Sequence, residues 1–456
     1  MTVQSINPAT GVPVRAFEVL QKEDLDALIP AAHEAAIGWG GIAMSERATK
    51  VGQIAVVLRT RKDELATLIT TEMGKPIRES RAEIEKCALV CDYYAMNGPG
   101  FLQDRRISTE AKKSYVRYDP LGLLLAVMPW NFPFWQLFRF AAPALTAGNG
   151  ILLKHASNVF GCGEAIEDVI REAGIGENVF TNLTMSSELV STVLSSKEVV
   201  AATLTGSEPA GKAVAECAGK HLKKTVLELG GSDPYLVLEN ADLELAVEKC
   251  AMSKLLNCGQ VCIAAKRFIV VDKVHDAFVQ GLRERMSQVV MGDPMQEDTE
   301  LGPMARSDLR QELHEQVARC IRKGAKLLLG GELPSEEQAG FFYPPTLLTN
   351  VVPGMPAYNL EMFGPVAAVI KVADDKEAIE VANDSDFGLG AAVFTRDRIR
   401  GEMIAAQLQA GTVAINDFVK SDPRMPFGGV KRSGYGRELA REGMLEFVNT
   451  KSVLVN

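Results

Sequence analysis

The hydrophobic pattern divides this chain into a helical beginning and two longer regions in which strands and helices alternate. In residues 21–36, 47–74 and 77–98, apolar side chains recur at the spacing of an amphipathic helix, with Gly or Asn-Gly near the ends. Residues 106–118 change to an alternating, charged, β-like pattern. A ribbon of this kind needs a partner to cover it.

From residue 121 onward, short apolar runs alternate with helix-like stretches. The predicted strands are 121–129, 150–156, 179–185, 199–206 and 224–231, and the predicted helices are 134–148, 162–176, 186–196 and 208–220. This alternation predicts a parallel, doubly wound sheet, which binds ligands at the carboxyl ends of its strands.

Residues 235–420 hold a second α/β series. Its predicted strands include 267–274, 325–331, 365–372, 390–397 and 411–416, and its helices include 242–257 and 306–324. The chain then ends in one short helix and a β-like tail at 451–456. The expected fold class is α/β, with two domains and a cleft between them.

Composition excludes several classes of protein. The chain has 456 residues, a net charge of −9 and a pI of about 5.4, so we expect no nucleic-acid or membrane partner. Its start lacks the pattern of a secretory signal, and its longest apolar run, 121–130, is too short to cross a bilayer. The eight cysteines form no CxxC pair, which is typical of reduced thiols in a cytoplasmic protein, and histidines are too few to suggest a metal site.

The most informative chemical feature is Cys262, which follows Gly259-Gln260 in a turn-like segment. Glu228 ends an apolar strand earlier in the chain, and none of the five histidines lies near either residue, as a Cys–His hydrolase would require. A cysteine with a carboxylate fits covalent capture of a carbonyl and attack of water on a thioester, the chemistry of aldehyde oxidation. The alternatives are an inert packed cysteine and a water-exposed glutamate.

Two side chains after the strand at 121–129 are candidates for substrate contacts. Asn131 can donate its amide to an oxyanion, together with the Cys262 backbone N–H, or can cap the next helix as an Asx-turn residue. Arg139 shares a helix face with Trp135 and can hold a carboxylate, or can form an ion pair between helices.

Two cofactor candidates follow predicted strands. The turn from Gly206 to Gly211 opens a helix whose free amides can receive a diphosphate. Lys154 ends the second strand and can reach ribose hydroxyls or a phosphate, with a solvated lysine as the ordinary alternative.

Six ordered motifs resemble the aldehyde dehydrogenase superfamily across essentially the whole chain. They are 129–133 (PWNFP), 204–207 (LTGS), 227–231 (LELGG), 259–262 (GQVC), 361–365 (EMFGP) and 426–429 (PFGG). The resemblance implies Cys262 as the nucleophile, Glu228 as the deacylation base and Asn131 as the oxyanion donor. It also implies a set of cofactor-binding residues: Pro129, Trp130, Lys154, Ser157, Gly206, Ser207, Gly211, Leu229, Glu361 and Phe363.

Within the superfamily, the chain is similar to the short bacterial succinate-semialdehyde dehydrogenases. Many NAD-preferring members have a glutamate three residues after the lysine, where this chain has Ser157, so we expect NADP to be preferred over NAD. Arg139 falls where that group has a carboxylate-binding arginine, and Trp135, Ser421 and Phe427 complete the expected substrate site.

Two positions depart from the pattern of the group. Where other members have a second arginine, this chain has Leu256, so the carboxylate needs another ligand, for which Ser421 and Lys420 are candidates. A second cysteine two positions after the nucleophile is replaced by Ala264, so we expect no redox disulfide there.

The resemblance also implies a domain division and an assembly. Residues 1–105 and 121–231 would form the cofactor-binding domain, 232–425 the catalytic domain, and 106–120 with 440–456 an oligomerisation ribbon and tail. We expect a homodimer or tetramer that oxidises a small aldehyde with a distal carboxylate. The alternatives are a dehydrogenase for glutarate semialdehyde or other aldehydes, a non-catalytic binding protein on the same fold, and a thiol hydrolase.

Overall fold

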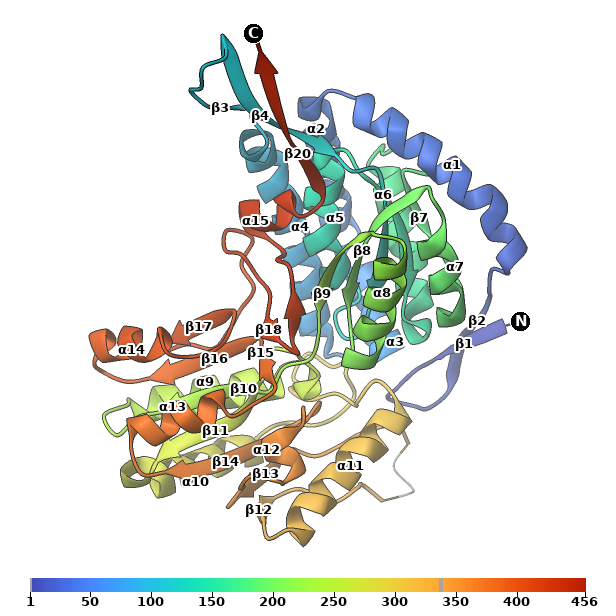
Figure 1. Ribbon diagram of the computed structural model, residues 1–456. Coiled ribbons are helices and arrows are strands. Elements are labelled where there is room, and N and C mark those ends of the chain that lie inside the picture. Colours follow the sequence, from blue (N-terminus) through green and yellow to red (C-terminus); the bar gives the residue numbers. More distant parts are fainter. Residues whose placement is uncertain (1, 336–338) are drawn as a thin grey trace.

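The computed structural model describes residues 2–335 and 339–456. Two sheets, each flanked by helices, form the body of the molecule, and a third sheet projects from it as a ribbon (Figure 1). A hairpin, β1 (Thr2–Ile6) and β2 (Pro13–Glu18), precedes four helices: α1 (Lys22–Gly41), α2 (Met44–Thr60), α3 (Lys62–Met73) and α4 (Ile77–Phe101). No helix within the described residues is long and apolar enough to cross a membrane.

The first sheet has the order β19-β9-β8-β5-β6-β7. Its strands are β5 (Leu123–Met128), β6 (Gly150–His155), β7 (Phe180–Asn182), β8 (Val199–Thr205), β9 (Lys224–Glu228) and β19 (Gly434–Tyr435). The strands predicted from the pattern, β5 to β9, are all parallel, and β19 adds an antiparallel edge. Because the chain leaves β5 for β6 on one side and reaches β8 on the other, the ends of β5 and β8 mark the point where a doubly wound sheet binds ligands.

Helices cover both faces of this sheet. They are α5 (Trp135–Ala147), α6 (Phe160–Glu172), α7 (Val190–Ser195) and α8 (Glu208–Lys220), with short 3-10 turns at Ser157–Val159 and Ser187–Leu189. Leu124 packs with α2, α4, α5 and α6 on one face, whereas Leu123 and Leu125 pack with α1, α7 and α8 on the other. Successive strand residues point to opposite faces, so an apolar run covered on both sides is the expected sequence for such a strand.

The second sheet has the order β12-β13-β14-β11-β10-β16-β17. Its strands are β10 (Asp233–Val237), β11 (Ala265–Val271), β12 (Lys326–Leu329), β13 (Thr346–Thr349), β14 (Val366–Val372), β16 (Gly390–Phe394) and β17 (Thr412–Ile415). All neighbours are parallel except β12 and β13. The sequence pattern did not identify β10 and β13, which are short and fully buried.

The helices of this region are α9 (Leu243–Leu255), α10 (Asp272–Ser287), α11 (Ser307–Arg322), α12 (Pro356–Asn359), α13 (Asp375–Asn383) and α14 (Arg398–Ala405). A two-stranded pairing of β15 (Phe387–Gly388) with β18 (Val430–Lys431) and the helix α15 (Ala440–Leu445) complete the body. The α/β fold class with two helix-flanked sheets is confirmed.

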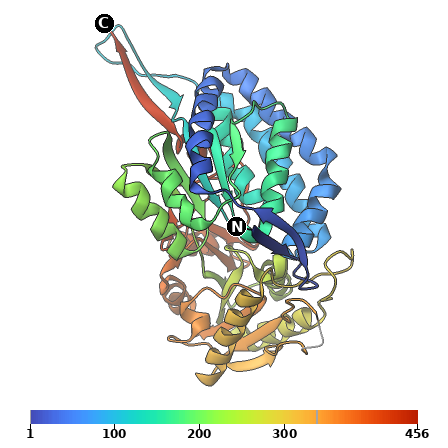
Figure 2. The same ribbon diagram turned by 90° about the vertical axis from the view of Figure 1, so that its right-hand side faces the viewer.

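The third sheet is the ribbon β20-β4-β3, formed by β20 (Val448–Val455), β4 (Lys113–Pro120) and β3 (Arg105–Arg106). Its tip carries the C-terminus and extends beyond the helices in both views (Figures 1 and 2). The β-like segment predicted at 106–118 therefore forms parts of two strands, with residues 107–112 between them. The tail predicted at 451–456 belongs to β20, which pairs with β4 along its full length.

Candidate active site

The segment that carries Cys262 is a tight turn between α9 and β11. Asn257, Cys258 and Gly259 all have positive φ, at 51°, 55° and 70°. A Cβ at Gly259 would lie 2.2 Å from the carbonyl oxygen of Gly364, so this position admits only glycine. Cys258 is buried in the second core, whereas Cys262 is only partly buried.

Hydrogen bonds to α4 and to the segment after β5 fix this turn. The Asn257 N–H donates to Glu79 on α4 at 2.8 Å, and the Asn257 amide donates to the Asn131 carbonyl at 2.7 Å. The side chain of Asn131 in turn donates to the Gln260 carbonyl at 2.9 Å. Asn131 therefore connects the end of β5 to the cysteine turn. Its side-chain amide, the predicted oxyanion donor, contacts Gln260, two residues before Cys262.

Cys262 lines two cavities. One, of about 200 Å³, is bounded by α4, α5, Leu256 and the 418–427 segment. The other, of about 480 Å³, lies between the ends of β5, β8 and β9 and the segment around Glu361. A sulfur between two cavities can contact a small molecule in one and a cofactor ring in the other.

Glu228 is the last residue of β9, and its side chain is buried at the wall of the larger cavity. Neither carboxylate oxygen has a hydrogen-bond partner within the described parts of the chain. Burial, reinforced by the negative charge of Glu438, raises the pKa of Glu228 well above its ordinary value. A carboxylate that is costly to ionise and has no partner fits a proton acceptor better than a structural role.

Burial also raises the pKa of the Cys262 thiol, to about 11, although the positive charges of Arg139 and Lys266 oppose the effect. The thiol is therefore protonated at neutral pH in this structure. Formation of the nucleophilic thiolate requires a group that accepts its proton.

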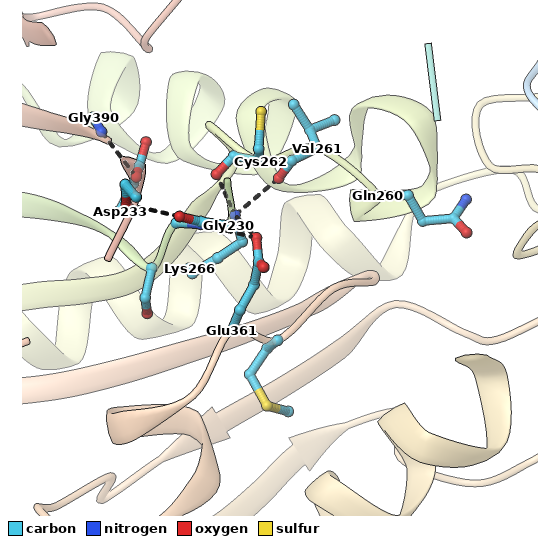
Figure 3. Close-up of polar contacts among 12 residues, drawn as sticks. Gly230, Asp233, Gln260, Val261, Cys262, Lys266, Glu361 and Gly390 are labelled. Atoms are coloured by element: carbon cyan, nitrogen blue, oxygen red, sulfur yellow. Dashed lines mark hydrogen bonds and ion pairs between the residues drawn. The ribbon is translucent and has the colours of Figure 1, made fainter. Parts of the chain in front are cut away.

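Lys266 joins the cysteine turn to Glu361 (Figure 3). Its ammonium donates to the carbonyls of Val261 at 2.8 Å and Cys262 at 2.5 Å, and lies 3.1 Å from Glu361 Oε1. Glu361 also accepts the Gly231 N–H at 3.2 Å. A Cβ at Gly230 would lie 2.3 Å from Glu361 Oε2, so a larger residue there would displace this carboxylate.

The larger cavity brings together most of the predicted cofactor residues. Its wall includes Pro129, Trp130, Gly206, Ser207, Leu229, Glu361 and Phe363. The Trp130 and Phe363 rings meet edge to face at 5.8 Å. Ser207 occupies the N-cap position of α8, where the free amides of the first turn begin, and its side chain makes no capping hydrogen bond. The aromatic walls fit the nicotinamide ring of a dinucleotide, and the helix N-terminus fits its diphosphate. The unpartnered carboxylate of Glu228 faces the same cavity.

Three predicted cofactor residues lie outside the described lining of both cavities. Gly211 has a packing role, because a Cβ there would lie 2.6 Å from the Leu229 side chain. Lys154 is the next-to-last residue of β6, where burial lowers its pKa, and Ser157 is exposed in the turn that follows the strand. Lys154 and Ser157 are thus three positions apart in the chain, at and just beyond the carboxyl end of β6.

The smaller cavity brings together the predicted substrate residues Trp135, Arg139, Ser421 and Phe427. Arg139 is buried, forms an ion pair with Glu438, donates to Thr205 Oγ1 at 3.2 Å and lies 4.8 Å above the Phe427 ring. The ion pair is the alternative considered for Arg139 from the sequence, although Glu438 lies before α15 and not in a helix, and carboxylate binding by Arg139 stays a prediction. The pair joins α5 to the segment before α15.

Sequence reasoning missed Lys86, Lys266 and Glu438. Lys86 lies in the middle of α4 and Lys266 in β11, and neither falls in a motif. Glu438 follows the 426–429 motif, and its position beside Glu228 depends on the pairing of β19 with β9. Only the run of Gly, Arg and Glu at 434–438 could have suggested a structured segment there.

A model of the aldehyde dehydrogenase family matches residues 1–453. The chain belongs to the aldehyde dehydrogenase family. An Escherichia coli protein named succinate semialdehyde dehydrogenase, NAD(P)+, is 47% identical over 98% of this chain and 97% of its own length. A Synechocystis protein named probable succinate-semialdehyde dehydrogenase, NADP(+), is 46% identical over 100% of both chains.

Solved structures of aldehyde dehydrogenases show the same fold. The crystal structure of succinic semialdehyde dehydrogenase from Streptococcus pyogenes in complex with NADP+ superimposes with a TM-score of 0.97 at 38% identity, over 99% of each chain. The resemblance inferred from the six motifs is thereby confirmed, and it extends over the whole chain.

Proposed function

We propose that this aldehyde dehydrogenase oxidises succinate semialdehyde to succinate with NADP+ as the preferred hydride acceptor. The observation that carries the proposal is the position of Cys262 between two cavities, one with cationic side chains and one with aromatic walls and a helix N-terminus. The names of relatives that are 46–47% identical support the same substrate and cofactor.

The chemistry follows from the arrangement. The Cys262 sulfur bonds to the aldehyde carbon, the Asn131 amide and the Cys262 N–H stabilise the oxyanion, and a thiohemiacetal forms. When bound, NADP+ supplies the hydride acceptor that turns this adduct into a thioester. Glu228 then takes a proton from water, which attacks the thioester carbon and releases succinate and the thiol. The balance is aldehyde, water and NADP+ giving carboxylate, NADPH and two protons.

The remaining cofactor and substrate residues have roles that follow from their positions. Glu361 would hold the nicotinamide ribose beside Phe363, and Gly206 with Ser207 would receive the diphosphate. Lys154 and Ser157 would bind the adenosine ribose and its 2′-phosphate, because serine has no charge to repel the phosphate. Trp135, Arg139, Ser421 and Phe427 would surround the substrate's carboxylate end.

We assign residues 1–105 and 121–231 to cofactor binding, 232–425 to catalysis, and 106–120 with 440–456 to assembly. The ribbon supports a homodimer or tetramer, since β20 is an edge strand with exposed Leu454 and Val455 near its tip. Light scattering should give a multiple of the 49.4 kDa chain mass, and a monomer would contradict the assignment.

The eight free cysteines support a reducing compartment, the cytoplasm.

The deciding experiment is NADPH or NADH formation at 340 nm with succinate semialdehyde, glutarate semialdehyde and butanal. We expect the highest kcat/KM with succinate semialdehyde and NADP+, and none with Cys262→Ala. Cys217→Ala, which changes a free cysteine of α8, is the matched control and should be unaffected. Equal kcat/KM for butanal and succinate semialdehyde would contradict the substrate assignment, and activity in Cys262→Ala would contradict the mechanism.

A further inference from the structure

A lysine that no motif contains faces the smaller cavity. Lys86 comes from α4, and its ammonium lies 4.1 Å from the centre of the Trp135 ring and donates to Ser421 Oγ at 2.8 Å. The three residues come from α4, α5 and the segment after β17, and Lys86 and Ser421 are 335 positions apart. Arg139, Phe427 and Cys262 line the same cavity as Lys86.

The other charged groups around the cavity already have partners. Glu83 pairs with Lys75, Arg139 with Glu438, and Lys420 with Asp417. Glu79 accepts the N–H of Asn257, and burial raises its pKa to about 7. Among residues 2–335 and 339–456, no carboxylate lies within ion-pair distance of Lys86, so its charge is left for a ligand.

The number of N–H donors on Lys86 also indicates that this side chain can bind a ligand. An ammonium has three N–H donors. One reaches Ser421 and another faces the π surface of Trp135, so one donor remains for a ligand in the cavity that Lys86 lines. A carboxylate that approaches here can accept from Lys86 and from the Ser421 hydroxyl, since that hydroxyl retains its own hydrogen.

We propose that Lys86, together with Ser421, binds the distal carboxylate of the aldehyde substrate and supplies the second cation of the site. The proposal rests on the proposed function and names the group that replaces the arginine missing at Leu256. Arg139 remains fixed by Glu438 and adds its positive charge from the same wall. Trp135 holds the Lys86 ammonium against the apolar surface that the carbon chain of the substrate would contact.

This arrangement implies a pH dependence specific to acidic aldehydes. Burial and then the positive charge of Arg139 lower the pKa of Lys86 to about 8, while Cys87, Glu83 and Asp422 oppose the shift. The ionisable groups Glu79, Cys262 and Lys420 also line the cavity. Below about pH 8 the Lys86 ammonium is charged, and above this pH it loses its charge. The KM for succinate semialdehyde should therefore rise above pH 8, and the KM for butanal should not.

The test compares Lys86→Met and Lys86→Arg on succinate semialdehyde and butanal, with NADP+. In Lys86→Met, kcat/KM for the semialdehyde should fall about 10- to 100-fold, mainly through KM, because a charge-assisted hydrogen bond is lost. The value for butanal should stay within about twofold, and Lys86→Arg should recover most of the loss. An equal loss on both aldehydes would show a structural role and overturn the proposal.

Two further lysines serve as comparisons. Lys420→Met changes the other lysine of this wall, which is paired with Asp417, and a loss of selectivity equal to that of Lys86→Met would overturn the assignment of the contact to Lys86. Lys197→Met, at an exposed side chain outside the cavity, controls for loss of one charge.

If wild type shows no preference for the semialdehyde over butanal, the proposed function fails. If wild type shows that preference and Lys86→Met keeps it, only the present inference fails.

Discussion

Arg139 and Glu438 form a buried ion pair that joins the helix after the cofactor strand β5 to the segment before α15. Both side chains are about 2% exposed. The pair lies between Glu228, whose pKa is raised by Glu438, and the wall of the substrate cavity, which Arg139 lines. One pair therefore influences both the deacylation base and the substrate site.

Removal of one partner of this pair should destabilise the protein. Arg139→Met should lower the free energy of unfolding by about 3–5 kcal/mol, because Glu438 would be left as an unpaired buried carboxylate. Without the arginine the folded-state pKa of Glu438 would rise further, so the loss should be small at low pH and grow as pH rises above the ordinary glutamate range. Chemical denaturation at pH 5 and pH 8 measures it.

The double variant Arg139→Met with Glu438→Met is the matched control. It removes both charges and should recover most of the stability while the activity toward succinate semialdehyde stays low. A single variant as stable as wild type at both pH values would contradict an energetically coupled pair.

Glu228 should set the acid side of the rate profile. Because burial and the charge of Glu438 raise its pKa, the basic form that activates water appears only above the ordinary glutamate pKa, so the steady-state rate should increase with pH well above pH 4. Glu228→Gln should slow deacylation by about 10²–10⁴ and give a burst of one NADPH per site, seen by stopped flow, followed by a stalled thioester.

Glu216→Gln on α8 is the control for this variant, since the Glu216 carboxylate is exposed and pairs with Lys220 at the surface. It should show the wild-type rate and pH profile. Steady turnover by Glu228→Gln without a burst would assign the base to another residue.

Lys266 should position both Glu361 and the cysteine turn. Lys266→Met removes the donors to the Val261 and Cys262 carbonyls and the cation beside Glu361, so kcat/KM for NADP+ should fall about 10- to 100-fold. Lys266→Arg keeps the charge and should lose less. Cofactor titration by fluorescence quenching separates the effect on binding from the effect on kcat, and unchanged values for both would contradict this role.

Ser157 should determine the choice between the two cofactors. In Ser157→Glu, the new carboxylate would repel a 2′-phosphate beside Lys154, so kcat/KM for NADP+ should fall at least about tenfold while the value for NAD+ is retained or rises. Ser157→Ala removes only the hydroxyl and should cause a smaller loss with NADP+. Retention of NADP+ preference by Ser157→Glu would place the phosphate elsewhere.

The sequence by itself determined the elements that depend on local pattern. Apolar runs such as 121–129 and 150–156 alternate with amphipathic stretches, and a strand buried on both faces requires that composition, so the parallel order of β5 to β9 could be anticipated. The glycines of the motifs also indicated where the backbone turns closely against other groups. The structure agrees, because a Cβ at Gly259 would meet a backbone oxygen and a Cβ at Gly230 would meet a carboxylate oxygen. The motifs therefore located the cysteine turn and the Glu361 segment.

Only the tertiary structure decided which charges meet at the site. Lys86 reaches Ser421 across 335 positions, and Glu438 reaches Arg139 only after β19 pairs with β9. The buried face of α4 is broad and Lys86 is only partly buried, so the periodicity of the helix does not reveal which residue faces a cavity. Long-range packing, rather than local propensity, fixes such contacts, and the ion pairing of the neighbouring side chains then determines which cation remains for a ligand.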